Sequence, residues 1–467
     1  MNSTVVLITL IAYKLLLIAI GIWASRRSHS EDEFFLGGRT LGPVVASVSY
    51  AASAASAWTL LGVSGVAYMI GISAIWIAIG AVLGCAISWI WLAPRMMAFS
   101  HREQILTTTE FLAHGHQGVW RARIVSSASA IVLLSFIFYI SSQFQGAGNT
   151  FASTFDISMA NSIILGGSII MLYTLLGGFW AVSVTDTLQG ILMLATAVLL
   201  PVTAWHTIGG WDAFWQGLQA VSSPDQLSLT GKNMGLLAAG VVVGNLATGI
   251  GTFGQPHLLA RFMAVRDARA LGQARVIAIS WYAIVFMGMC FLGLAGHVLA
   301  PDLANPETIF FHLTEQLFPP VIAAILLAAI LSAIMSTADS MLLVSAATVA
   351  HDLGLAKRFP GRELLLSRGV IAVICAVAIA VAIYLPESIF TRVLFAWIAI
   401  GSAFGPPVIA RLAGWLCPAP VVLAAILSGF GLAILFYLLP NTPGDILERL
   451  LPFTVASLIL VIGRKKN

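Results

Sequence analysis

The feature that most constrains this chain is a succession of apolar runs, each about twenty residues long and separated by short polar breaks. A helix needs about 20 residues to cross the hydrocarbon core of a bilayer. Only 9% of the 467 residues are charged and 59% are hydrophobic, whereas a soluble globular domain carries roughly a quarter charged residues. The sequence therefore excludes a soluble protein and predicts an all-α polytopic membrane protein.

The apolar runs predict about thirteen transmembrane helices. Their expected ranges are 5–25, 41–66, 70–94, 122–150, 158–176, 180–203, 234–258, 271–299, 319–350, 365–384, 388–412, 418–438 and 447–463. The first run is unlike a signal peptide, because no basic segment precedes it and Arg26 and Arg27 follow it directly. We therefore expect a retained first helix with its N-terminus outside.

The distribution of basic residues tests this orientation. With the N-terminus outside, all 23 Lys and Arg residues fall on the cytoplasmic side except Lys14, Lys232, Arg392 and Arg449. Loops rich in Lys and Arg remain cytoplasmic. The distribution therefore predicts a multi-pass protein of the cell (inner) membrane with a cytoplasmic C-terminus, and it assigns the net charge of +4 to these loops rather than to nucleic-acid binding.

Two apolar stretches contain too many small residues to be ordinary membrane helices. They are 51–65 (AASAASAWTLLGVSG) and 243–254 (VGNLATGIGTFG). Interrupted helices at corresponding places in two halves of a membrane protein are typical of a transporter's binding site, because the break frees backbone carbonyls and exposes a helix dipole. The alternative is close helix packing through small residues. The similarity of two such distant stretches favours binding.

Two carboxylates, Asp186 and Asp339, lie inside apolar runs. A carboxylate within the membrane is costly unless it is paired or hydrated, so each indicates a functional site. Both have hydroxyl neighbours, among them Ser336 and Thr337, and a hard cation such as Na⁺ prefers oxygen ligands. The alternative is that each hydroxyl only bonds the carbonyl one turn back.

Other interpretations of these residues remain open. Asp186 or Asp339 could couple transport to protons, and a solute sensor built on a transporter-like domain is a further alternative, although no kinase or linker follows Lys466. An intramembrane aspartyl protease is disfavoured because neither Asp lies in a GxGD motif. The four cysteines lack CxxC spacing, and His114 and His116 lack further ligands, so we expect no bound transition metal.

Several contiguous blocks resemble the sodium:solute symporter family, in particular its bacterial sodium/proline symporter branch. The blocks are EFFLGGRTLGPVVASVSYAASAASAW, GGFWAVSVTDTLQGILM, FGQPHLLARFMA and AAILSAIMSTADSMLLVSA, within residues 33–411. The resemblance implies a leucine-transporter-type inverted repeat of five plus five helices and alternating access driven by a Na⁺ gradient. The implied regions are 1–40 (first helix and cytoplasmic link), 41–203 (first repeat), 204–233 (external loop with a short interfacial helix near Trp211 and Trp215), 234–412 (second repeat) and 413–467 (two helices and a basic tail).

The resemblance also implies site residues. The sodium site would take the carbonyls of Ala52, Ala55 and Ala333 and the hydroxyls of Ser336 and Thr337. A second ion would lie at Asp186, Asp339 and Ser340, and the substrate at Ser56, Trp58, Tyr139, Thr248, Thr252 and Gln255. In the proline branch the position of Ala54 is an Asp and the positions of Thr248 and Thr252 are aromatic. The solute pocket of this chain is therefore expected to be more hydroxylated, and its substrate need not be proline.

Taken together, the sequence predicts a Na⁺-coupled secondary active symporter and no enzyme activity. The expected solute is small, polar and organic, an amino acid (proline-like) or a related carboxylate. Na⁺, the solute and membrane lipid are the expected partners, without nucleic acid or an obligate protein partner.

Overall fold

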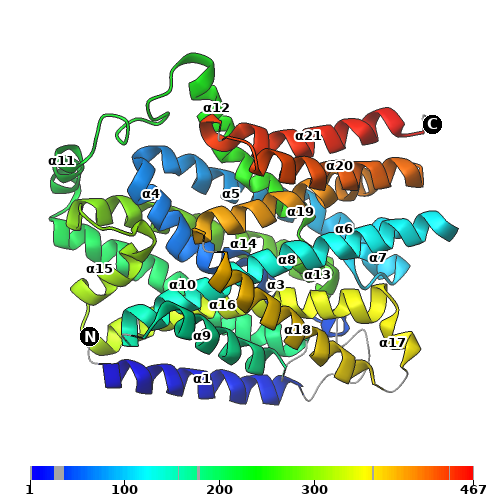
Figure 1. Ribbon diagram of the computed structural model, residues 1–467, viewed down its shortest axis with the longest axis horizontal. Coiled ribbons are helices and arrows are strands. Elements are labelled where there is room, and N and C mark those ends of the chain that lie inside the picture. Colours follow the sequence, from blue (N-terminus) through cyan, green and yellow to red (C-terminus); the bar gives the residue numbers. More distant parts are fainter. Residues whose placement is uncertain are drawn as a thin grey trace.

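The computed structural model describes residues 3–25, 36–155, 157–175, 179–359, 362–385, 387–440 and 442–465. The helices run mostly along the long axis of the molecule, and the two termini lie at opposite ends of it (Figure 1). We call these ends the N-terminal end and the C-terminal end. The described residues do not include Arg26, Arg27 and Lys466, whose charges entered the predicted orientation. They also do not include Glu33, where the resemblance to the symporter family begins.

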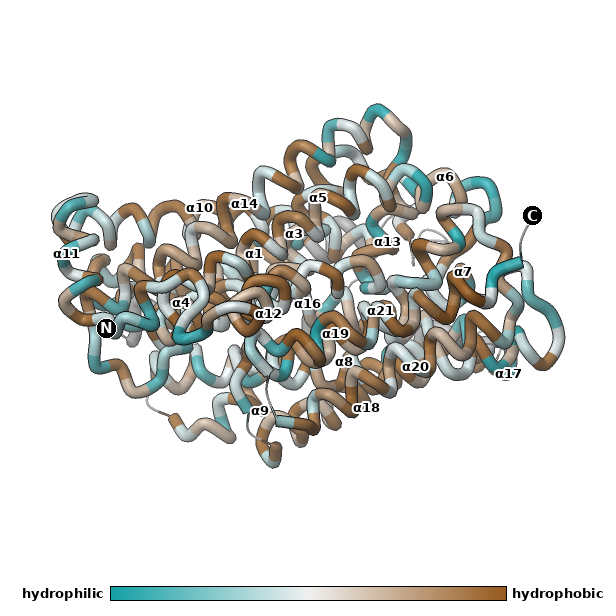
Figure 2. The backbone as a smooth tube through the Cα atoms, turned by 90° about the horizontal axis from the view of Figure 1, so that it is seen from above, coloured by the Kyte–Doolittle hydropathy of each residue, from teal (hydrophilic) through white to brown (hydrophobic). Residues whose placement is uncertain are grey.

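Ten helices in the described part of the chain are long and apolar enough to cross a membrane, and Leu7–Ile20 and Met159–Leu172 are shorter apolar helices. One of the ten, Pro43–Glu103, has 61 residues, about three times the length of one crossing. It turns back at Gly71, where φ is 70°. If the two arms of this 61-residue helix are counted separately and the two shorter helices are included, the described residues contain the thirteen apolar segments that the sequence predicts. Hydrophilic residues gather mainly toward the two ends (Figure 2).

The centre of the bundle is formed by five long helices that pack on one another or on the two interrupted stretches. These are α3 (Pro43–Ala57), α10 (Phe179–Ile208), α14 (Ala268–Leu299), α16 (Pro320–Ala347) and α19 (Ile389–Leu412). In the spans that contain α16 and α19, 83% of the most apolar 18-residue segment is buried inside the protein. The corresponding share is 22% in the span that contains the last helix. The polar side chains of α16 therefore lie where water and lipid are excluded.

The remaining long helices surround this centre. They are α1 (Ser3–Ser25), α5 (Ile75–Ile87), α6 (Ala93–Glu103), α8 (Gly118–Phe155), α9 (Met159–Thr174), α18 (Glu363–Tyr384), α20 (Ala419–Tyr437) and α21 (Ile446–Gly463). α1 packs against α10 and α16, and the pair α20 and α21 packs against α19. The first helix and the last two helices thus pack on the outside of the central group.

Short helices cover both ends of the bundle. α11 (Trp211–Val221) and α15 (Ile309–Leu317) lie at the N-terminal end, whereas α7 (Thr108–Ala113) and α17 (Leu355–Arg358) lie at the C-terminal end (Figure 1). Trp211 and Trp215 on α11 are 64% and 46% exposed, as expected of Trp at the headgroup level. The short helix predicted within 204–233 is therefore present.

Candidate functional site

The first interrupted stretch breaks at a single residue. α3 extends into the interrupted stretch 51–65 as far as Ser56, where φ is 23° and ψ is −174°, and the chain resumes as a π-helical turn (Trp58–Val63) and α4 (Ser64–Ile70). Ser56 Oγ accepts a hydrogen bond from Trp58 N at 3.1 Å, and Gln143 Oε1 accepts one from Ala57 N at 3.0 Å. Side chains thus satisfy the amides that the break frees. This explains why the unwinding is narrower than expected.

Hydroxyls of α16 meet the carbonyls just before this break. Ser336 Oγ donates to Ala52 O at 3.1 Å and to Ala333 O at 3.2 Å. Thr337 Oγ1 donates to Ser53 O at 2.8 Å. All five residues are fully buried. The structure therefore gathers four of the five predicted sodium ligands, with Ser53 O as an oxygen that the sequence did not name; Ala55 O instead accepts from Trp58 N.

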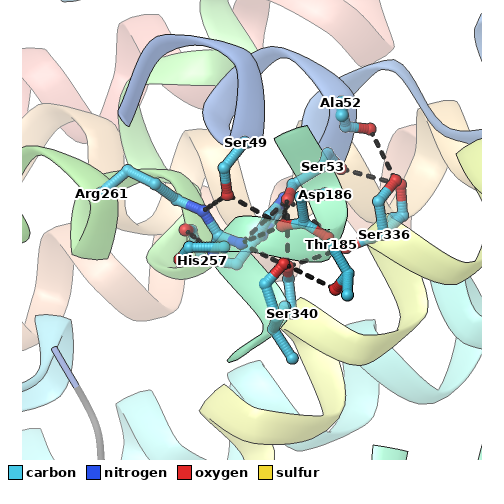
Figure 3. A network of polar contacts seen from close by, with 12 residues as sticks. Ser49, Ala52, Ser53, Thr185, Asp186, His257, Arg261, Ser336 and Ser340 are labelled. Carbon is cyan, nitrogen blue, oxygen red and sulfur yellow. Dashed lines mark hydrogen bonds and ion pairs between the residues drawn. The ribbon is translucent and has the colours of Figure 1, made fainter. Parts of the chain in front are cut away.

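A buried ion pair lies beside these oxygens, as Figure 3 shows. Asp186 Oδ2 on α10 accepts from Arg261 Nη2 at 2.9 Å and from Ser49 Oγ at 2.8 Å. Arg261 Nη2 also donates to Ser53 Oγ at 2.9 Å and to Ser340 Oγ at 2.5 Å. Both charged side chains are at most 1% exposed. The pair connects α3, α10 and α16 to α13 (Pro256–Ala264), and Ser53 belongs to it and to the neighbouring oxygen cluster.

The three residues expected at a second ion site do not come together. Asp186 and Ser340 share the guanidinium of Arg261, whereas Asp339 Oδ1 accepts from Thr174 Oγ1 on α9. Successive residues on an α-helix point about 100° apart, so Asp339 and Ser340 face different neighbours. A cation bound at Asp186 and Ser340 would have to displace the positive charge of Arg261.

The predicted substrate residues on the first half of the chain form one wall. Tyr139 OH donates to Ser56 Oγ at 3.3 Å. The ring of Trp58 stacks on Phe390 at 5.9 Å and contacts Phe286 at 5.5 Å. Trp58 Nε1 is buried and has no hydrogen-bond partner among the described residues. This wall is therefore aromatic and retains one free donor.

The second interrupted stretch is longer than the first. α12 (Gly235–Leu246) is followed by a 3₁₀ stretch, Ala247–Gly254, and Gln255 is extended before α13 begins. Thr248 and Thr252 are 2% and 3% exposed. Gln255 Nε2 donates to Gly251 O at 3.0 Å, while its Oε1 has no partner within the described ranges. The second wall thus keeps one free acceptor.

Trp397 on α19 joins the two walls. Its Nε1 donates to Thr248 O at 3.1 Å, and its carbonyl accepts from Gln255 Nε2 at 2.9 Å. Its ring meets the ring of Tyr139 edge-on at 6.4 Å. Three of the predicted substrate residues, Tyr139, Thr248 and Gln255, therefore contact one residue that the sequence did not single out.

Cavities lie on either side of this region. At the N-terminal end, a cavity of about 680 Å³ is lined by Asp225, Lys232, Arg449 and Phe390 among others, and Phe390 separates it from Trp58. On the other side, a cavity of about 30 Å³ touches Arg261 and Ser340, enough for roughly two water molecules. The predicted substrate residues between the two cavities are all at most 8% exposed.

Two residues of the site were missed by sequence reasoning. Arg261 was counted among the charges of cytoplasmic loops, yet it lies in the bundle, and Trp397 has no distinctive local pattern. One feature of the sequence could have placed Arg261 near the site: it follows the second interrupted stretch by less than two helical turns. Nothing local reveals that its partner is Asp186.

Comparisons with known proteins agree with this architecture. The model of the sodium:solute symporter family matches residues 34–413. The osmoregulated proline transporter OpuE of Bacillus subtilis is 34% identical over 419 residues, 88% of this chain and 84% of the relative. A sodium/proline symporter of Staphylococcus aureus is 34% identical over 418 residues, 87% of this chain and 80% of the relative. A solved Na⁺-coupled sialic acid symporter, in a substrate-bound outward-open state, superposes with a TM-score of 0.78 at 19% identity and covers 99% of both chains.

Proposed function

The chain belongs to the sodium:solute symporter family and is a Na⁺-coupled solute symporter, and we propose that it imports an amino acid (proline-like) or a related small carboxylate by alternating access. The names of the two bacterial relatives support an amino acid. The two buried groups without partners support the same class of solute: Trp58 Nε1 can donate to a carboxylate and Gln255 Oε1 can accept from an ammonium group.

The observation that carries the proposal is the contact between α16 and the first break. Ser336 and Thr337 donate to the carbonyls of Ala52 and Ser53 in a dry environment. Hydroxyls can rotate and present their lone pairs to a cation, so Na⁺ bound here would be held by oxygens of both helices. The ion would thereby fix α3 against α16, next to the Ser56 wall of the solute pocket.

We further propose the arrangement of the chain in the membrane. Residues 41–203 and 234–412 would form the two inverted repeats, each beginning with one of the broken helices. The N-terminus would lie outside and the C-terminus in the cytoplasm. Three observations support this orientation: the described residues contain an odd number of apolar segments, the termini lie at opposite ends, and α6, which carries Arg95 and Arg102, lies toward the C-terminal end (Figure 1).

Coupling between the ion and the solute must be reciprocal, so Na⁺ tightens solute binding by the same factor by which solute tightens Na⁺ binding. We predict that Thr337→Ala raises the Na⁺ concentration for half-maximal uptake by about tenfold, because one ligand is lost, and changes uptake at saturating Na⁺ much less. Uptake of radiolabelled solute into proteoliposomes at graded Na⁺ measures both quantities.

Ser345→Ala is the matched control, because Ser345 is a buried hydroxyl of the same helix that bonds only Met341 O one turn back. Its Na⁺ dependence should equal that of the wild type. If Thr337→Ala also keeps wild-type Na⁺ dependence, the ion site is misplaced. Uptake that persists without Na⁺ and collapses with an uncoupler would instead indicate proton coupling.

The solute itself can be identified by stability. A ligand that binds only the folded protein raises stability by RT ln(1 + [L]/Kd). We expect one group of amino acids or small carboxylates to raise the melting temperature in Na⁺ and to do so much less in choline. Equal shifts with and without Na⁺ would contradict coupling at the proposed sites.

A further inference from the structure

A third cavity, of about 460 Å³, lies at the C-terminal end of the bundle, and its lining includes none of the predicted ion or substrate residues. It is walled by the turn between α7 and α8, by the end of α19 and by residues 414–418. Lys465, which follows α21, stands at its rim. The cavity is large enough for a small ligand and has no role in the transport mechanism proposed above.

The ionisable groups that line this cavity are basic or neutral. They are His114, His116, Arg411, Cys417 and Lys465. A carboxylate lies nearby, that of Glu103, whose Oε2 is 3.5 Å from His114 Nε2, but Glu103 also pairs with Arg102 at 2.7 Å. The lining therefore carries a net positive charge.

Arg411 is the central cation of this cavity. Its Nη1 donates to His114 O at 2.6 Å and its Nη2 to Leu112 O at 3.3 Å. Among the described residues no carboxylate pairs with it, in contrast to Arg261, which pairs with Asp186, and Arg449, which pairs with Asp445. Neutral carbonyls fix the guanidinium in place but leave its charge uncompensated. Such a cation is a ready partner for an anion.

The pKa of His116 also reflects the positive charge around this cavity. Burial, followed by the charges of Arg411 and His114, lowers the pKa of His116 below its usual value. His116 is therefore neutral at pH 7 and contributes a hydrogen-bonding group rather than a charge. Arg411 and Lys465 remain as the permanent charges of the cavity.

We propose that this cavity binds a phosphate group, carried by an anionic phospholipid or by a small soluble phosphate compound. The guanidinium of Arg411 suits a phosphate, because it offers several N–H donors in one plane. The position suits a lipid headgroup, since basic pockets between helices at the membrane boundary bind such groups. Leu416, Leu458 and Ile462 are 60%, 52% and 82% exposed along this segment and α21, where acyl chains could lie.

The test uses the full-length protein in a neutral detergent. Thermal unfolding is followed with dioctanoyl phosphatidylglycerol, with dioctanoyl phosphatidylcholine and with inorganic phosphate. We expect phosphatidylglycerol to raise the melting temperature more than phosphatidylcholine does. Arg411→Gln should weaken the phosphatidylglycerol effect by about tenfold in concentration, as for the loss of one charge-assisted bond, and Arg411→Lys, which keeps the charge but loses the planar donors, should weaken it by a smaller factor.

Lys465→Gln provides a second variant, because this exposed side chain can be changed without disturbing the fold, and it should weaken the effect by a smaller factor. Arg95→Gln is the matched control, since Arg95 is an exposed cation of the C-terminal half of the bundle that stacks on Trp91 outside the cavity. Stabilisation by Na⁺ verifies that each variant is folded.

The outcomes separate the two sources of phosphate. A shift with inorganic phosphate that equals the lipid shift and requires Arg411 assigns a soluble ligand, and a shift with the lipid alone assigns a headgroup. The proposal is overturned if no anion stabilises the protein, or if the shifts are unchanged in both Arg411→Gln and Lys465→Gln.

Discussion

The two broken helices interrupt their hydrogen bonding in different ways. In the first, one residue departs from helical geometry, and the carbonyls before it accept hydrogen bonds from Ser336 and Thr337 of α16. In the second, eight residues, Ala247–Gly254, form a 3₁₀ stretch before the chain becomes extended at Gln255. The first break is met by hydroxyl groups that can exchange partners, whereas the second is held by the Trp397 side chain and by close contacts with the backbone of α5.

Close backbone contacts surround the second break. A Cβ atom added at Gly249 would lie 2.0 Å from Gly80 O on α5, and one added at Gly251 would lie 2.0 Å from Cδ1 of Trp397. No side chain fits in such gaps, so this stretch has little freedom to rearrange locally. The difference fits the roles proposed above, in which the first break holds the ion and the second is a rigid wall of the solute pocket packed on α19.

The largest expected effect tests the rigidity of the second break. Gly251→Ala forces a methyl group into the indole of Trp397, which should cost about 1–3 kcal/mol or more and abolish uptake. Gly431→Ala, where a Cβ meets nothing within 4 Å, should be neutral. Yield of monodisperse protein and solute uptake measure both variants. A well-folded, active Gly251→Ala protein would show that this wall is adaptable.

The next prediction concerns the ion pair that links the two broken helices. Asp186→Asn or Arg261→Gln alone leaves a buried charge without its partner and should cost about 3–5 kcal/mol of stability. The double variant should recover much of that loss. Unfolding by denaturant in detergent measures it, with the exposed Arg102→Gln as a control expected to stay within about 0.5 kcal/mol. Additive losses in the double variant would contradict direct pairing.

A smaller effect is expected at the first break itself. Ser56 has a φ of 23°, which favours glycine, and its Oγ caps Trp58 N. Ser56→Ala removes the cap and keeps the strain, at a cost of about 1 kcal/mol, whereas Ser56→Gly loses only a few tenths. The solute KM should therefore rise more in Ser56→Ala.

Ser64→Ala is the control for the first break, because Ser64 bonds only carbonyls within its own helical segment. Its KM should match that of the wild type. A lower KM for Ser56→Ala than for Ser56→Gly would mean that the backbone strain at Ser56 has no influence on the pocket.

Much of the fold was predictable because its signals are local. The apolar runs set the helices, and the small residues of 51–65 and 243–254 marked both breaks. The extent of the first break was not predictable, since it depends on Gln143, 86 positions away, which satisfies the amide of Ala57. Local composition carries no information about such a partner.

The candidate site was predictable to a similar degree. Four of the five predicted ion ligands take part in one set of hydrogen bonds, whereas the carbonyl of Ala55 is used within its own turn. Asp339 bonds Thr174 and Asp186 bonds Arg261, so a second ion site that contains both carboxylates stays a prediction. A helix directs neighbouring residues to different sides, and only packing decides which helix each side meets. Trp397 was missed because the sequence around a tryptophan in an apolar helix does not distinguish a core position from a position that lines a pocket.

The sequence by itself determined that this protein is a bundle of membrane helices with two interruptions and buried oxygen-bearing side chains, because length, apolarity and small-residue content act locally. The tertiary structure alone decided that Arg261 pairs with Asp186, 75 positions away, while Arg411 lines a cavity and pairs with no carboxylate in the described part of the chain. The energy of a charge inside a membrane protein depends on what lies within a few ångströms of it, and only the folded chain defines those neighbours.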